Sequence, residues 1–170
     1  MTLDTEKAAL QHALDLCRAH EAALGDALAD MDRRSWVAAE LDHLSKADRR
    51  LLDQFAYRYT RLQDDMGQRL IPAALRALGE DIGPMPMLDR LNRLEQLRWL
   101  PSAEEWTELR RIRNEFTHEY PESPEERRER LELATHAARR LVEIVGIMER
   151  RAGEHGLAQT ADTGRTKPSL

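Results

Sequence analysis

The sequence is poor in several residue types on which particular kinds of protein depend. Its single cysteine, Cys17, excludes an intramolecular disulfide and a zinc site built from cysteines. No stretch approaches the roughly 18 uncharged apolar residues of a membrane span, and the N-terminus lacks the apolar core of a signal peptide. We therefore expect a cytoplasmic protein that has no membrane partner.

Basic residues are also fewer than acidic ones, so the formal net charge of the chain is −5. This balance argues against a protein that coats nucleic acid by bulk attraction, although a local basic site remains compatible with it. Only Lys7, Lys46 and Lys167 are lysines, so arginine supplies most of the 26 positive charges. Arginine favours planar, bidentate ion pairs and phosphate contacts over contacts with a point charge.

Apolar residues recur at spacings of three and four along most of the chain, which is typical of amphipathic helices. The pattern predicts five helices. The first covers residues 5–31, and the second runs from Ser45 to a stop at Gly79, with a kink at Pro72. The third contains Leu88, Leu91 and Leu94, the fourth runs from Ser102 to Pro121, and the fifth runs from Ser123 to about Ala152. Residues 33–44 are ambiguous. Strand patterns, internal repeats and glycine-rich phosphate loops are missing from the sequence. We therefore expect an all-α, antiparallel up-and-down bundle of about five helices, followed by a flexible tail over residues 153–170.

Three serines mark expected helix starts, because each precedes an acidic residue by three positions. Serine at the N-cap accepts a hydrogen bond from the backbone three residues on, and an acidic residue there suits the positive end of the helix. The pairs are Ser45 with Asp48, Ser102 with Glu105, and Ser123 with Glu126.

The most informative window is Arg113-Asn114-Glu115-Phe116-Thr117-His118-Glu119-Tyr120-Pro121. Asn114 and His118 lie on one helical face, whereas Arg113 and His118 lie about 140° apart on an ideal helix. They converge if the helix frays near Thr117 or if the partner group comes from a second subunit. A guanidinium, an imidazole, an amide and a phenol at one helix end suit phosphate chemistry. The alternative is a solvated surface, since such a spacing arises easily by chance.

The same window resembles the Arg-x4-His-x-Tyr motif of the HepT-like toxins in the HEPN superfamily. The resemblance covers Ser45 to Ala152, and implies a single HEPN-like domain over residues 1–152 in which residues 1–44 form a helical extension to a core over residues 45–152. It implies a metal-independent ribonuclease that acts as a homodimer, with Arg113 and His118 of both subunits facing one cleft. Tyr120 corresponds to the tyrosine to which a cognate minimal nucleotidyltransferase antitoxin adds AMP.

The mechanism implied is transesterification within the RNA substrate, without a metal or cofactor. His118 would move a proton, Arg113 would stabilise the charge on the phosphorane, and Asn114 would orient His118. The alternative is a non-catalytic helical partner that presents Tyr120 to a nucleotidyltransferase. The presence of both Arg113 and His118 favours the ribonuclease, whereas the acidic residues around them and the N-terminal extension favour the partner.

Other polar residues carry weaker hypotheses. The remaining histidines have no spacing partners for a metal site, and each is expected at the surface or at its boundary; they are His12, His20, His43, His136 and His155. Asp64 and Asp65 are either metal ligands or, as we favour, surface partners of Arg61 or Arg69. Trp106 either stacks on a base or, as we favour, belongs to the core or to a dimer interface.

Overall fold

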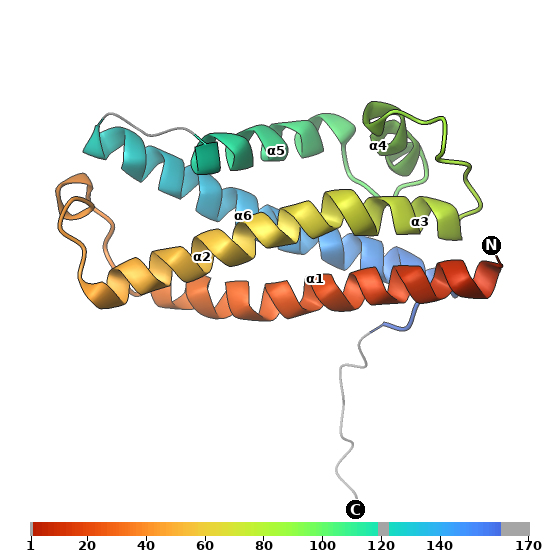
Figure 1. Cartoon of the computed structure of the whole chain (residues 1–170), viewed down its shortest axis with the longest axis horizontal. Helices are drawn as coiled ribbons and strands as arrows, with labels where there is room; N and C mark the ends of the chain where they lie inside the picture. The colour runs from red at the N-terminus through yellow and green to blue at the C-terminus, as the bar shows by residue number, and fades with distance from the viewer. Residues whose placement is uncertain (1, 119–122, 161–170) are drawn as a thin grey trace, which may run out of the picture.

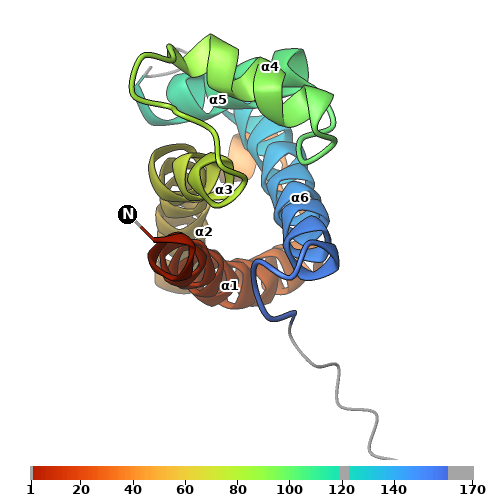
Figure 2. The same cartoon turned by 90° about the vertical axis from the view of Figure 1, so that its right-hand side faces the viewer.

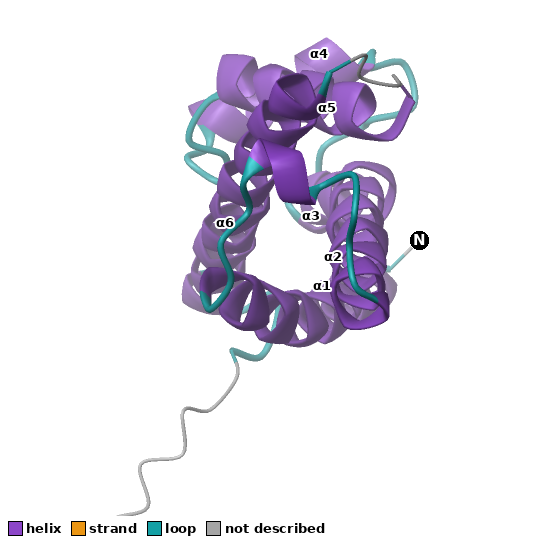
Figure 3. Ribbon diagram, turned by 90° about the vertical axis from the view of Figure 1, so that its left-hand side faces the viewer, coloured by secondary structure: helices purple, strands orange, loops and turns teal. Residues whose placement is uncertain are grey.

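The computed structural model describes residues 2–118 and 123–160, and every regular element in them is helical (Figures 1 and 3). A π turn, η2 (Met66–Leu70), joins α2 (Lys46–Asp65) to α3 (Ile71–Ala77), so that these two make one long rod and the described residues form five helices. A short 3-10 turn, η1, lies in the segment that the sequence left ambiguous. The bounds are α1 Leu3–Asp32, η1 Ala38–Glu40, α2 Lys46–Asp65, η2 Met66–Leu70, α3 Ile71–Ala77, α4 Met87–Gln96, α5 Ala103–His118 and α6 Pro124–Glu154. The predicted all-α bundle is confirmed.

The predicted helix starts are confirmed at the level of individual hydrogen bonds. The hydroxyls of Ser45, Ser102 and Ser123 each accept a hydrogen bond of 3.1 Å from the backbone N–H three residues on. At the other end of α3, Gly79 adopts a φ of 84°. The chain reverses there because glycine reaches this left-handed conformation without steric cost.

Pro72 was expected to kink the second helix, and the structure also has a π turn just before it. Proline has no N–H to continue the helical ladder. The helix widens just before it: the N–H of Ile71 bonds the carbonyl of Met66, five residues back, within η2. Gly67 lies in this turn, and a Cβ added to it would lie 3.5 Å from Trp106 of α5. The π turn therefore lets the rod continue while α5 approaches its backbone closely.

Helix α1 is part of the bundle core rather than an arm added to it. It packs against α2, α3 and α6 and lies between the α2–α3 rod and α6 in the end view (Figure 2). Leu10, Leu14, Cys17 and Leu24 are fully buried. Burial raises the pKa of the Cys17 thiol to about 12, which keeps it protonated and unreactive. The core therefore extends over α1 as well as over residues 45–152.

The prediction of a free tail from Gly153 is wrong for its first residues. Helix α6 continues to Glu154, and Leu157 is buried. The N–H of Gln159 donates to the side chain of Gln11 at 2.8 Å, and Arg18 donates to the carbonyl of Gln159 at 3.2 Å. The chain after α6 therefore docks on α1 as far as this contact. Residues 161–170 lie outside the described part of the chain. Among the residues that the structure describes, no helix contains an apolar stretch of the length that a membrane span requires.

A carboxylate of α1 makes the stability of this packing depend on pH. Burial, followed by repulsion from Glu149, raises the pKa of Glu21 from its ordinary value of 4.5 to about 7, although Arg18 acts in the opposite direction. Between these two values the folded protein retains a proton that the unfolded chain loses. Glu21 therefore costs the fold increasing free energy as the pH rises from about 4.5 to 7, and a constant amount above that.

We expect Glu21→Gln to unfold like the wild type near pH 4 and to be more stable at pH 8. The gain is about 1–3 kcal/mol at pH 8, because the amide never ionises. Urea unfolding at both pH values measures it, and Glu132→Gln, at an exposed carboxylate of α6, controls for the loss of one negative charge. A gain of equal size at both pH values would contradict the assignment.

Candidate functional site

The side chains of Arg113 and His118 meet at the C-terminal end of α5. Nη1 of Arg113 lies 3.5 Å from Nε2 of His118, and the Arg113 side chain is 17% exposed. Because a guanidinium has only donors, the imidazole nitrogen in this contact is the acceptor. The expectation that the two groups need a frayed helix or a second subunit in order to meet is therefore wrong. The long arginine side chain spans the angle between their positions on one helix.

Asn114 contacts the arginine rather than the imidazole. Its Oδ1 accepts a hydrogen bond of 3.3 Å from Nη1 of Arg113. In the described part of the chain, no hydrogen bond between Asn114 and His118 therefore supports the predicted role of Asn114 in orienting His118. Tyr120, the fourth member of the predicted site, lies outside the described residues.

Asp64 is a member of this site that the sequence analysis missed. Nη2 of Arg113 donates to both of its carboxylate oxygens, at 3.0 and 2.8 Å. The pair joins α5 to α2 and leaves Nη1 turned toward His118 and Asn114. Because the partners are 49 residues apart, no local spacing signals the contact. Asp64 was instead expected to pair with a neighbour on its own helix.

Asp65 pairs with Arg61 and Arg69 as expected, at 3.8 and 3.3 Å, but it is not a surface residue. It is 4% exposed, and its Oδ2 lies 2.8 Å from Nε2 of His20 on α1. His20 is also buried, contrary to its expected place, and Arg58 contacts its other ring nitrogen at 3.3 Å. Within residues 2–118 and 123–160, no group of three His, Cys, Asp or Glu side chains could hold a metal ion.

Aromatic contacts position the C-terminal half of α5 on α2. Phe116 meets the rings of Phe55 and Tyr59 edge-on, with centroids 5.9 and 5.7 Å apart. Burial raises the pKa of the Tyr59 hydroxyl, and the nearby charge of Arg113 opposes that shift. These ring contacts and the pair between Arg113 and Asp64 together hold this part of α5 against α2.

A cavity of about 360 Å³ adjoins Arg113, between α5, α4 and the rod formed by α2, η2 and α3. We call it the α2–α5 cavity. Its walls include three guanidinium groups, one carboxylate, three amides and an indole, which belong to Arg90, Arg110, Arg113, Asp64, Gln63, Gln68, Asn114 and Trp106. The positive balance of its walls contrasts with the net charge of −5 of the whole chain.

Comparison of the chain with protein-family models, with curated proteins and with solved structures finds no match in any of the three.

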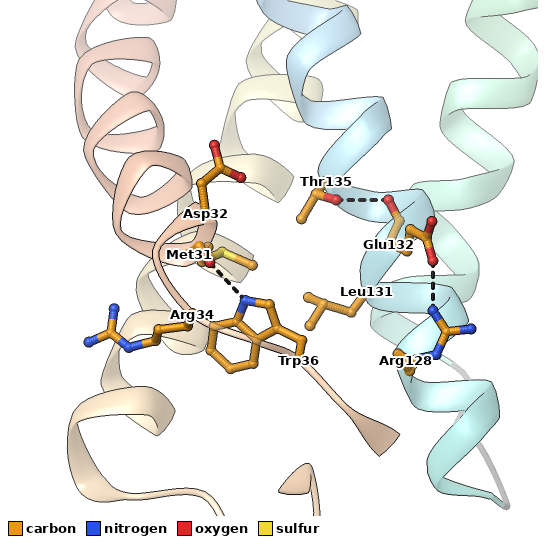
Figure 4. A pocket seen from close by; sticks show the side chains of 8 residues that line it. All are labelled: Met31, Asp32, Arg34, Trp36, Arg128, Leu131, Glu132 and Thr135. Atoms are coloured by element: carbon orange, nitrogen blue, oxygen red, sulfur yellow. Dashed lines mark hydrogen bonds and ion pairs between the residues drawn. The ribbon is translucent and has the colours of Figure 1, made fainter. Parts of the chain in front are cut away.

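A second hollow, of about 280 Å³, lies between the end of α1 and the start of α6 (Figure 4). Its polar groups bond to neighbours within the protein. The indole of Trp36 donates to the carbonyl of Met31 at 3.0 Å, and Arg128 pairs with Glu132 at 2.8 Å. Thr135 donates to the carbonyl of Glu132 at 2.8 Å. This hollow therefore offers a ligand fewer unused hydrogen-bonding groups than the α2–α5 cavity.

Proposed function

We propose that this protein is a metal-independent endoribonuclease with a HEPN-like fold, and the toxin of a toxin–antitoxin pair. The observation that carries the proposal is the contact of 3.5 Å between Arg113 and His118. It brings an anion-binding group and a proton-transfer group together beside a positively lined cavity. The acidic neighbours Glu108 and Glu115 oppose this charge less than the sequence suggests, because both pair with Arg111.

The proposed reaction is a transesterification within the RNA. A base takes the proton of a ribose 2′-hydroxyl, and that oxygen attacks the adjacent phosphorus. The bond from phosphorus to the 5′-oxygen breaks, and an acid protonates the leaving oxygen, so the products end in a 2′,3′-cyclic phosphate and a 5′-hydroxyl. His118 is the proton carrier. Nη1 of Arg113, which faces His118, stabilises the extra negative charge on the phosphorane.

The reaction has two proton transfers, and a single imidazole serves one of them at a time. We therefore propose that the active form is a homodimer, in which the second copy of His118 supplies the other role. A second subunit is not needed to bring Arg113 and His118 together, because they already meet within one chain.

We further propose that a cognate minimal nucleotidyltransferase acts as the antitoxin and adds AMP to Tyr120. Tyr120 is two residues beyond His118 in the sequence. A bulky anion attached there would repel and obstruct a substrate phosphate.

The ion pair between Arg113 and Asp64 favours a second candidate function. It already neutralises part of the charge that a phosphate would meet. A protein of this kind could be the non-catalytic partner of a nucleotidyltransferase, with Asp64 and Arg113 serving only to hold α5 on α2.

RNA cleavage by the purified protein distinguishes the two candidates. The protein is produced in cells without the nucleotidyltransferase, so that Tyr120 carries no AMP, and is incubated with single-stranded RNA and a metal chelator. We expect products with 2′,3′-cyclic phosphate ends. Intact RNA under these conditions would overturn the ribonuclease proposal and favour the non-catalytic partner.

A further inference from the structure

The α2–α5 cavity has positive groups that the protein itself does not neutralise. Arg90 is held by backbone, because its Nε and Nη2 donate to the carbonyls of Met85 and Ile82 at 3.0 Å each. Arg110 is exposed. Neither guanidinium has a carboxylate partner in the described part of the chain, whereas Arg113 pairs with Asp64. The cavity is therefore suited to a ligand that carries a phosphate.

Its walls also contain buried polar groups without a hydrogen bond. Gln63 is 3% exposed, and neither atom of its amide has a partner among the described residues. The same holds for Nε1 of Trp106, which is 2% exposed. Buried polar groups are nearly always paired, because an unpaired one costs about 1–3 kcal/mol. The hollow of Figure 4, by contrast, pairs the indole of Trp36 with a carbonyl.

The π turn η2 forms one wall of the α2–α5 cavity. Such turns are frequent at functional sites. Gly67 in this turn lets Trp106 approach the backbone, and both residues line the cavity. A volume of about 360 Å³ lies near the lower end of the range for small-molecule sites, roughly 300–1,000 Å³. The space therefore suits one nucleotide better than a longer stretch of strand.

We infer that the α2–α5 cavity binds one nucleotide of single-stranded RNA and prefers adenine to guanine. The phosphate lies against Arg90 and Arg110, the two guanidinium groups that have no carboxylate partner among the described residues, and the base lies against Gln63. An amide offers one donor beside one acceptor, which matches N7 and N6 of adenine, whereas guanine presents two acceptors at these positions. The amide of Gln63 is covered in the free protein, so binding requires it to rotate toward the cavity.

The assignment to RNA rests on the proposed function, but recognition of a nucleotide does not, so binding is measured without cleavage. We expect 5′-AMP to bind roughly 10-fold tighter than 5′-GMP by calorimetry. Gln63→Leu should weaken AMP binding roughly 10-fold without lowering the unfolding temperature, because it removes an unpaired buried group. Gln54→Leu, at an exposed position of the same helix, should bind AMP like the wild type.

A deoxyuridine pentamer with one central deoxyadenosine, which cannot be cleaved, tests the source of the nucleotide. It should bind tighter than AMP and tighter than the same strand with deoxyguanosine. If AMP binds and the strand does not, the ligand is a free nucleotide and the RNA assignment is overturned. If AMP does not bind, or if Gln63→Leu binds it unchanged, the site itself is overturned.

RNA cleavage is also measured on the same wild-type sample, so that failure of the nucleotide site can be distinguished from failure of the proposed ribonuclease function. A protein that cuts RNA but does not bind AMP contradicts only the cavity. A protein that binds AMP through Gln63 but leaves RNA intact supports nucleotide binding and contradicts only the ribonuclease.

Discussion

Arg113→Ala and His118→Ala are each expected to reduce RNA cleavage about 100- to 10,000-fold. Loss of a positioned proton carrier, or of the group that stabilises a developing oxyanion, costs this much in enzymes of known mechanism. His118 is exposed at the end of α5, and the Arg113 side chain, 17% exposed, pairs with Asp64, so neither substitution removes an apolar side chain from the core. The initial rate of cleavage of a fluorescent single-stranded RNA, with chelator present, is the measurement.

Matched variants separate chemistry from general damage to the fold. Arg111→Ala removes a guanidinium two positions away on the same helix, where it pairs with Glu108 and Glu115. His136→Ala removes an exposed imidazole from α6. Both should retain most of the activity, and all four variants should keep the helical circular dichroism. Full activity in His118→Ala would show that His118 is not the proton carrier. Equal losses of activity in all four variants would contradict the assignment of the catalytic site to Arg113 and His118.

The Lys variant of Arg113 gives a further distinction. Arg113→Lys keeps the charge but loses the planar group that contacts Asp64 on one side and His118 on the other. If Arg113 positions a phosphate through this geometry, lysine should restore only a minor part of the lost rate. Full restoration would mean that a positive charge alone suffices.

Asp65→Ala is expected to destabilise the fold by about 2–4 kcal/mol. Asp65 is 4% exposed and contacts His20 at 2.8 Å, so the change removes a charge-assisted hydrogen bond and leaves buried polar groups unpaired. The bond also joins α1 to α2, which are close neighbours throughout the bundle (Figure 1). Urea unfolding followed by circular dichroism measures the loss.

Glu132→Ala is the control for this variant, because it breaks the exposed pair between Glu132 and Arg128. Exposed pairs contribute roughly 0–1 kcal/mol, so this variant should unfold almost like the wild type. The double variant His20→Ala/Asp65→Ala should lose less than the sum of the two single losses, by at least about 1 kcal/mol. Additive losses would show that the two side chains do not stabilise the fold as a pair.

Local patterns in the sequence are enough to predict the helices and three of their starts. The caps at Ser45, Ser102 and Ser123 depend on residues three positions apart, so their hydrogen bonds are local and can be predicted without the fold. The same holds for the apolar seams and for the stop at Gly79, where the backbone conformation itself calls for glycine. The position of Arg113 and His118 at the end of one helix also followed from the sequence.

The partners of the polar side chains, by contrast, depend on how the helices pack in three dimensions. Asp64 and Asp65 are neighbours in the sequence, yet the first meets Arg113 on α5 and the second meets His20 on α1. Adjacent residues on a helix point about 100° apart, so which helix each one faces depends on packing between distant segments. The docking of residues 155–160 on α1 and the α2–α5 cavity depend on packing in the same way. Helical periodicity is a local property, whereas the partners of a charged side chain are set by which surfaces come together.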